Sequence, residues 1–369
     1  MNGATQLPGD HSPVGAVRRT SAARRIGQGL AANGFGMSVT LIVQLVSVPV
    51  LLAAWGVPTY GEWLVLSAVP TYVALSDLSF SVVAGNSMVM LEAQGKHTDA
   101  VTLGRRLWSI VTLMTGIAVL AAGAIALVFG RAFGSGAAIP SSEAQVVLVA
   151  LFLQIAVGNQ YGVLDVWYRT DGRYPLSATL RQFGRLLEFG ALVGSVILGA
   201  RPGVASFAFL GASVVGFGVS WVVLRRAVPW STFRLERPHF NTFRELFAPG
   251  IAFMAFPVGN ALSLQGLTIV VGAMLGAPAV VVLSTTRTIT RVTLQAMSAL
   301  GNSVWPELSR SVGGGHLEEA RLILIRATQL SVAGSLSLVL FLAVAGPDII
   351  RWWTHGAVDP PRDLLYLLP

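Results

Sequence analysis

Two arginines lie within a long apolar stretch of this sequence. Arg287 and Arg291 are four residues apart, so a helix places both on one face. Polar residues continue that face at steps of three or four: Ser284, Arg287, Arg291, Gln295, Ser298 and Asn302. A charged side chain at the middle of a membrane helix costs roughly 2.5–3.5 kcal/mol on insertion scales. This face must therefore line a cavity or a neighbouring helix rather than lipid.

The chemistry that suits two such arginines is anion binding. A guanidinium fork donates paired hydrogen bonds to a diphosphate or a carboxylate. Arg287, Arg291 and Gln295 are therefore candidates for binding an anionic substrate. A structural alternative stays open, in which the two arginines pair with carboxylates or backbone carbonyls of other helices.

Further polar residues occur in other apolar segments. Asn33 and Gln44 share a face of residues 30–54, and Asn260 follows Pro257, which can loosen a helix and free its carbonyls. We take these three polar residues as further cavity candidates. The alternative is that they form ordinary hydrogen bonds between helices.

Asp77 is the candidate for ion coupling or gating. It would bind H+ or Na+, or it would pair with Arg287 or Arg291 when the halves of the protein close. Arg185 and Glu188, three residues apart in another apolar segment, are expected to neutralise each other within their helix.

The composition places these residues in a membrane protein. Only 11% of the 369 residues are charged, against about 25% in an average soluble domain, and the mean hydropathy is +0.67. These values exclude a soluble enzyme, a disordered protein and a secreted disulfide scaffold. The absence of cysteine excludes disulfides and thiolate metal sites, and the five histidines lack metal-ligand spacing. We expect no metal or other cofactor; coupling to H+ or Na+ is left open.

Nine stretches are apolar enough to span a membrane, which predicts an all-α, polytopic fold: 30–54, 63–88, 107–129, 144–166, 179–199, 204–224, 248–275, 279–304 and 325–346. With the N-terminus inside, seventeen Lys and Arg fall in cytoplasmic segments and four in external ones. This bias predicts a cytoplasmic N-terminus and explains the pI of 10.7 without nucleic acid. All loops are short, so we expect no inserted catalytic domain and no enzyme.

Three short matches indicate an internal repeat. Gly56-Val57-Pro58 recurs as Gly276-Ala277-Pro278, an offset of 220, and similar matches link 85–87 to 301–303 and 95–100 to 315–320. The repeat predicts two six-helix bundles related by a pseudo-twofold axis along the membrane normal. We expect a basic segment at 1–28, a first bundle at 29–230 and a second at 231–369. That second bundle holds three helices and the start of a fourth, so we expect the sequence to be truncated.

Several motifs resemble a known family. Residues 60–80 read YGEWLVLSAVPTYVALSDLSF, followed by Ala84-Gly85-Asn86-Ser87-Met88 and Gly95-Lys96-His97-Thr98-Asp99-Ala100. This resembles the polysaccharide (O-antigen and teichoic acid) exporters of the multidrug/oligosaccharidyl-lipid/polysaccharide flippase superfamily. Ser79 stands where members often have Gly.

The resemblance implies a flippase of the bacterial inner membrane, crossing it several times. It would move a polyprenyl-diphosphate-linked oligosaccharide to the outer leaflet by alternating access, as in lipopolysaccharide biosynthesis. Its expected partners are the lipid bilayer, this anionic glycolipid, and glycosyltransferases or a polymerase of the same pathway. A cation-coupled multidrug antiporter of the same superfamily is the alternative.

Overall fold

The computed structural model describes residues 13–132, 138–236, 258–291, 294–295 and 317–359. Every regular element in these ranges is helical, as the sequence predicts. The elements are α1 (Pro13–Ala93), α2 (His97–Ala132), α3 (Ser141–Thr170), α4 (Tyr174–Ile197), α5 (Pro202–Ala227), the π-helix η1 (Leu262–Gly266), α7 (Leu267–Leu275) and α9 (Leu317–Trp353). A further helix covers 277–291. Six helices in the described ranges are long and apolar enough to cross a membrane.

The first element, α1, is two membrane helices joined at a sharp bend. Gly56 has φ 72° and ψ 170°, a backbone conformation that is open essentially to glycine alone. The bend separates the predicted spans 30–54 and 63–88. The element α1 therefore contains both predicted spans, which meet at the bend without a loop.

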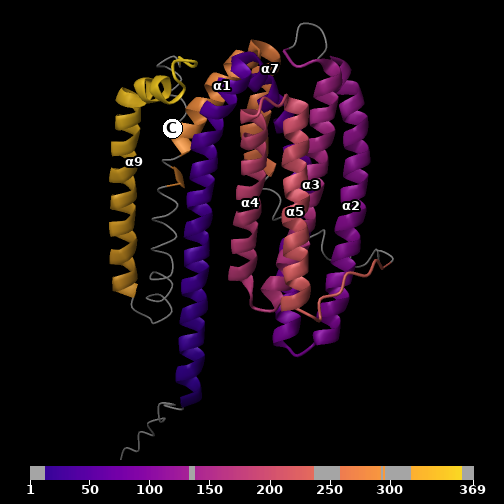
Figure 1. The fold of residues 1–369 in the computed structure, drawn as a ribbon. Helices are drawn as coiled ribbons and strands as arrows, with labels where there is room; N and C mark the ends of the chain where they lie inside the picture. Colours follow the sequence, from indigo (N-terminus) through magenta and orange to yellow (C-terminus); the bar gives the residue numbers. More distant parts are fainter. Residues whose placement is uncertain (1–12, 133–137, 237–257, 292–293, 296–316, 360–369) are drawn as a thin grey trace, which may run out of the picture.

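The helices α1 to α5 pack into one bundle (Figure 1). Two clusters of buried apolar side chains form its core. One surrounds Leu66, Leu148 and Val281, and the other surrounds Trp167, Leu107 and Leu224. The turns at 94–96 and 171–173 lie at the end of the bundle where α1 begins, and the α4–α5 turn lies at the other (Figure 1). The Gly56 bend lies beside the α4–α5 turn, because Trp55 Nε1 donates a hydrogen bond to the carbonyl oxygen of Ala200 at 3.0 Å. This alternation agrees with the predicted order of the first six spans.

The helices extend beyond the predicted spans. The segment predicted at 107–129 belongs to a helix that begins at His97, and the one predicted at 325–346 belongs to Leu317–Trp353. Hydropathy marks the part of a helix inside the apolar layer, whereas backbone hydrogen bonding continues past it. The helix ends therefore do not test the predicted span bounds, and parts of the predicted spans 248–275 and 279–304 lie outside the described residues.

The second bend of the chain repeats the first. Gly276 ends α7 with φ 83° and ψ 176°, close to the angles of Gly56, and helix 277–291 follows. The sequence match between Gly56-Val57-Pro58 and Gly276-Ala277-Pro278 is thus also a match of backbone conformation. The other two sequence matches include residues 301–303 and 315–316, which lie outside the described ranges.

The two bends also contact each other. A Cβ atom on Gly61 would collide with the backbone carbonyl of Ala277, and one on Gly272 would lie 2.6 Å from a methyl carbon of Val65. Because glycine stands at both positions, the helix that follows the Gly56 bend comes into close contact with α7 and with the start of helix 277–291, on either side of the Gly276 bend. The start of the second half is therefore fastened directly onto α1.

Candidate functional site

Arg287 is directed at the irregular turn of the facing helix. Its Nη1 donates hydrogen bonds to the carbonyl oxygen of Leu264 at 2.9 Å and to the Thr268 hydroxyl at 3.2 Å. Leu264 lies in η1, where the backbone follows a π-helix and the regular bonding pattern is broken. The guanidinium thus satisfies a carbonyl at the irregular turn. Pro257, expected to loosen this helix, lies outside the described residues, so its effect stays a prediction.

The second nitrogen of the same guanidinium is not used by the fold. Arg287 Nη2 is buried and has no hydrogen-bond partner among the described residues. Arg291, one turn further, is half-buried and likewise makes no hydrogen bond or ion pair within the described part of the chain. Buried donors are normally paired, and an unpaired cationic one is costly. This pair of side chains therefore retains capacity to bind an anion.

These contacts bear on the alternative that the two arginines pair with carboxylates or backbone carbonyls of other helices. Arg287 does contact a backbone carbonyl of another helix, as that alternative expected, but no carboxylate of the described residues neutralises it. Asp77, the carboxylate predicted to pair with it, lies in α1 with its side chain outside the described part. The pairing of Asp77 therefore stays a prediction.

Gln295 connects the two halves of the sequence. Its Nε2 donates a hydrogen bond to Gln44 Oε1 at 3.0 Å, across a sequence separation of 251 residues. Gln295 Oε1 is buried and without a partner in the described ranges. Two residues selected independently as cavity candidates are thus in direct contact, between α1 and the polar face that carries Arg287 and Arg291.

The remaining predicted residues are not brought into this cluster. Asn260 is exposed and makes no hydrogen bond with any described residue. The side chain of Asn33 lies outside the described part, as do Ser298 and Asn302. Of the residues that the sequence indicates for the cavity, the structure therefore brings together Arg287, Arg291, Gln295 and Gln44.

A second polar region inside the first bundle was mostly missed by the sequence analysis. Arg185 donates a hydrogen bond to the Thr40 hydroxyl of α1 at 3.1 Å, and Glu188 lies near Gln154 of α3 and Ser213 of α5. No salt bridge within 4 Å is described between Arg185 and Glu188, although the Arg185 charge still acts on Glu188, and each side chain also contacts another helix.

The same region contains unsatisfied polar atoms. Gln160 Oε1, Tyr161 Oη and Gln182 Oε1 are buried without hydrogen-bond partners among the described residues. Buried polar groups of this kind are usually satisfied by water. Isolated Gln and Tyr residues in apolar helices gave no distinctive spacing, so only contacts between helices reveal the region.

The Tyr60-Gly61-Glu62-Trp63 motif positions the bend rather than the polar site. Tyr60 and Trp63 are buried, and Gly61 permits the close contact with Ala277 described above. Glu62 accepts hydrogen bonds from the backbone N–H groups of Ala138 and Ile139, both at 2.7 Å. The motif therefore fixes where the helices α1 and α3 and the second half of the chain meet.

No protein-family model matches the chain, and no curated protein matches it in sequence. Solved structures do match it. The inward-facing conformation of a multidrug resistance MATE family transporter of the MOP superfamily aligns with a TM-score of 0.60 and 15% identity, over 92% of this chain and 75% of the other. The outward-facing conformation of such a transporter aligns with a TM-score of 0.57 and 16% identity, over 93% and 77%.

The chain has the fold of the MATE transporters of the MOP superfamily. A third structure supports this assignment: a MOP superfamily transporter from Pyrococcus furiosus, whose reverse polarity of binding pocket suggests a different function for it, aligns with a TM-score of 0.57 and 16% identity over 93% of this chain and 77% of that one. In this fold, the protein is a multi-pass membrane protein whose polar face with Arg287 lies where its two halves meet.

Proposed function

We propose that this protein transports an anionic, lipid-linked oligosaccharide across the membrane by alternating access. The observation that carries the proposal is the half-buried guanidinium of Arg287. Its Nη1 is held by hydrogen bonds, while its buried Nη2 has no hydrogen-bond partner in the described part of the chain. Arg291 adds a second positive charge one turn away. A diphosphate is a good ligand for two such groups because its oxygens accept several hydrogen bonds at once.

The fold supports the transport part of this proposal. Structures of this fold are described in both inward-facing and outward-facing conformations. Near the polar face, the described residues of the two halves are joined by a neutral hydrogen bond between Gln44 and Gln295. Neutral hydrogen bonds contribute only about 0.5–1.5 kcal/mol each. A contact of this strength can break and form again during a transport cycle.

A lipid-linked substrate suits the position of the two arginines. The headgroup would occupy the polar face between the halves, while the polyprenyl chain stays in the bilayer. No covalent step is needed. The bacterial inner membrane and the direction from the cytoplasmic to the outer leaflet belong to the same proposal, together with the cytoplasmic N-terminus that the distribution of Lys and Arg predicts.

A cation-exporting multidrug antiporter is the second candidate. It is favoured by the multidrug resistance transporters that share the fold. Glu188, a half-buried carboxylate inside the first bundle, also favours it. Arg287 and Arg291 oppose it, because two positive charges on one face repel a cationic drug. The reverse polarity of the binding pocket of the Pyrococcus furiosus transporter, which suggests a different function for it, supports the view that this fold is not limited to one function.

Binding distinguishes the two candidates. Purified protein is mixed with a polyprenyl diphosphate or with ethidium, and unfolding is followed by tryptophan fluorescence. We expect the diphosphate to raise the melting temperature, because a ligand that binds only the folded state stabilises it. Ethidium should have no such effect.

Variants at the two arginines complete this test. Loss of a hydrogen bond to a charged group costs about 1.5–3 kcal/mol, so Arg287→Gln should weaken diphosphate binding roughly tenfold or more. Arg226→Gln, at an exposed position at the end of α5, is the matched loss of charge and should bind as the wild type does. Stabilisation by ethidium and none by the diphosphate would favour the antiporter instead.

A further inference from the structure

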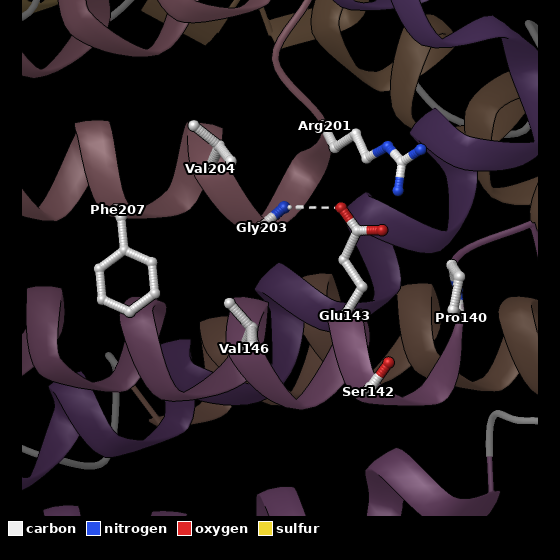
Figure 2. A pocket seen from close by; sticks show the side chains of 8 residues that line it. All are labelled: Pro140, Ser142, Glu143, Val146, Arg201, Gly203, Val204 and Phe207. Carbon is white, nitrogen blue, oxygen red and sulfur yellow. Dashed lines mark hydrogen bonds between the residues drawn. The ribbon is translucent and has the colours of Figure 1, made fainter.

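A pocket lies at the surface of the first bundle, where α3 and α5 begin. It has a volume of about 490 Å³ and is bounded by residues of both helices, among them Glu143, Val146, Arg201, Val204 and Phe207 (Figure 2). The Gly56 bend lies close to it, because Trp55 Nε1 donates a hydrogen bond to the carbonyl oxygen of Ala200, next to Arg201, at 3.0 Å. None of the residues considered for transport lines it.

The pocket carries one acidic and one basic side chain at the same end. Figure 2 shows the Glu143 carboxylate and the Arg201 guanidinium there, with Phe207 at the opposite end. Glu143 Oε1 accepts a hydrogen bond from the backbone N–H of Gly203 at 3.1 Å, which fixes the carboxylate. No ion pair joins Glu143 to Arg201 within 4 Å, so the two charges flank the pocket without neutralising each other.

Beyond Glu143, Arg201 and the exposed Ser142, the lining is apolar and lies at the surface of the protein. Val146, Val204 and Phe207 are 40%, 62% and 49% exposed, respectively. They follow the charged residues at helical spacing: Arg201, Val204 and Phe207 along α5, and Glu143 and Val146 along α3. The pocket therefore changes from charged at the helix ends to apolar toward the middle of the membrane, in the same order as a phospholipid molecule.

The close approach of the helices forms the floor of this groove. A Cβ atom on Gly203 would lie 3.3 Å from Glu143 Cγ and 3.3 Å from a methyl carbon of Val146. Glycine at this position leaves room for the side chains of Glu143 and Val146 against α5, and the exposed side chains beyond it form the walls. A groove of this shape accommodates an acyl chain lengthwise.

We propose that this groove binds a phospholipid whose headgroup carries both a phosphate and a primary ammonium, as phosphatidylethanolamine does. Arg201 donates hydrogen bonds to the phosphate, and the ammonium donates to the free oxygen of Glu143. One acyl chain lies along Val146, Val204 and Phe207. A guanidinium suits the phosphate because it can donate two parallel hydrogen bonds to its oxygens.

Charge complementarity selects this headgroup among the common ones. Phosphatidylglycerol has no cation for Glu143, and its negative charge is repelled by that carboxylate. Phosphatidylcholine has a quaternary ammonium, which cannot donate a hydrogen bond. Of these three lipids, only phosphatidylethanolamine has an ammonium that donates hydrogen bonds to Glu143 as well as a phosphate that accepts them from Arg201.

Native mass spectrometry of the full chain in detergent tests the proposal. The protein is titrated with dioleoyl forms of phosphatidylethanolamine, phosphatidylglycerol and phosphatidylcholine, and bound lipids are counted. We expect one phosphatidylethanolamine to bind about tenfold more tightly than either other lipid, as expected for an added charge-assisted hydrogen bond. Equal occupancy by all three lipids would overturn the proposal and show only non-selective contact with the membrane.

Three variants locate the site. Glu143→Gln keeps an oxygen that can accept the Gly203 N–H bond, so the protein should fold and lose only its preference for phosphatidylethanolamine. Arg201→Gln should weaken all three lipids, and Val204→Trp should fill the groove and remove the bound lipid with both charges intact. Arg226→Gln, at the other end of α5, is the control. An unchanged preference in both Glu143→Gln and Val204→Trp would contradict the assignment.

Discussion

Single side chains fix the ends of helices in this protein, and Glu62 is the clearest case. Its two carboxylate oxygens accept the N–H groups of consecutive residues, Ala138 and Ile139, just before α3 begins. The sequence drew attention to Glu62 only through the resemblance of its motif. Its partners are 76 and 77 residues away, and no local pattern predicts such a contact.

Replacing Glu62 should weaken the fold. Glu62→Ala leaves two backbone donors without their acceptor, one of them on the buried residue Ile139, and a hydrogen bond to a charged group contributes about 1.5–3 kcal/mol. We expect the free energy of unfolding to fall by about 2 kcal/mol, measured by denaturant titration in detergent. Glu318→Ala, at an exposed carboxylate in the first turn of α9, is the control and should change little. Equal stability of the two variants would show that the bonds of Glu62 contribute nothing.

Some residues of the polar site could be predicted from the sequence, and others could not. The spacing of Arg287, Arg291 and Gln295 on one helix face was sufficient to select them, because helical periodicity is local. Leu264 could not be selected, since its contribution is a backbone carbonyl at a π-helical turn. Thr268 resembles many other threonines that bond only to their own helix, and its contact with Arg287 depends on how two helices pack.

At the scale of the element, the two glycine bends govern how the helices are arranged. Gly56 and Gly276 adopt nearly the same backbone conformation, and the sequence had paired them through their offset of 220 residues. The positions of the two glycines and their correspondence were therefore predictable from the sequence, whereas their backbone conformation was not. The two expected spans are both present in α1, but Gly56 turns the chain between them where the sequence analysis left a connecting segment at 55–62.

Alanine at either bend should be unfavourable. The conformation at both positions is open essentially to glycine, and a non-glycine residue there costs on the order of 1–3 kcal/mol. We expect Gly56→Ala and Gly276→Ala to lower the melting temperature of the purified protein. Gly116→Ala is the matched control, because a Cβ atom there has open space around it and alanine favours a helix. Wild-type stability in both bend variants would show that the bends tolerate another conformation.

At the scale of the whole molecule, two halves meet across a polar face within a membrane. The α1 helix contributes Gln44, and the second half contributes Gln295 with Arg287 and Arg291 on the same face. The all-helical membrane fold was predictable, because low charge and long apolar stretches leave few alternatives. The polar interior of the first bundle was not, because single Gln and Tyr residues on separate helices come together only in three dimensions.

Transport by reconstituted protein tests the central claim most directly. Proteoliposomes are loaded on one side with a fluorescent polyprenyl-diphosphate oligosaccharide, and its appearance in the opposite leaflet is measured. The account predicts translocation by the wild type and by Arg226→Gln, and at least a tenfold lower rate for Arg287→Gln/Arg291→Gln. Translocation by the double variant at the wild-type rate would contradict an anionic passenger bound at these arginines.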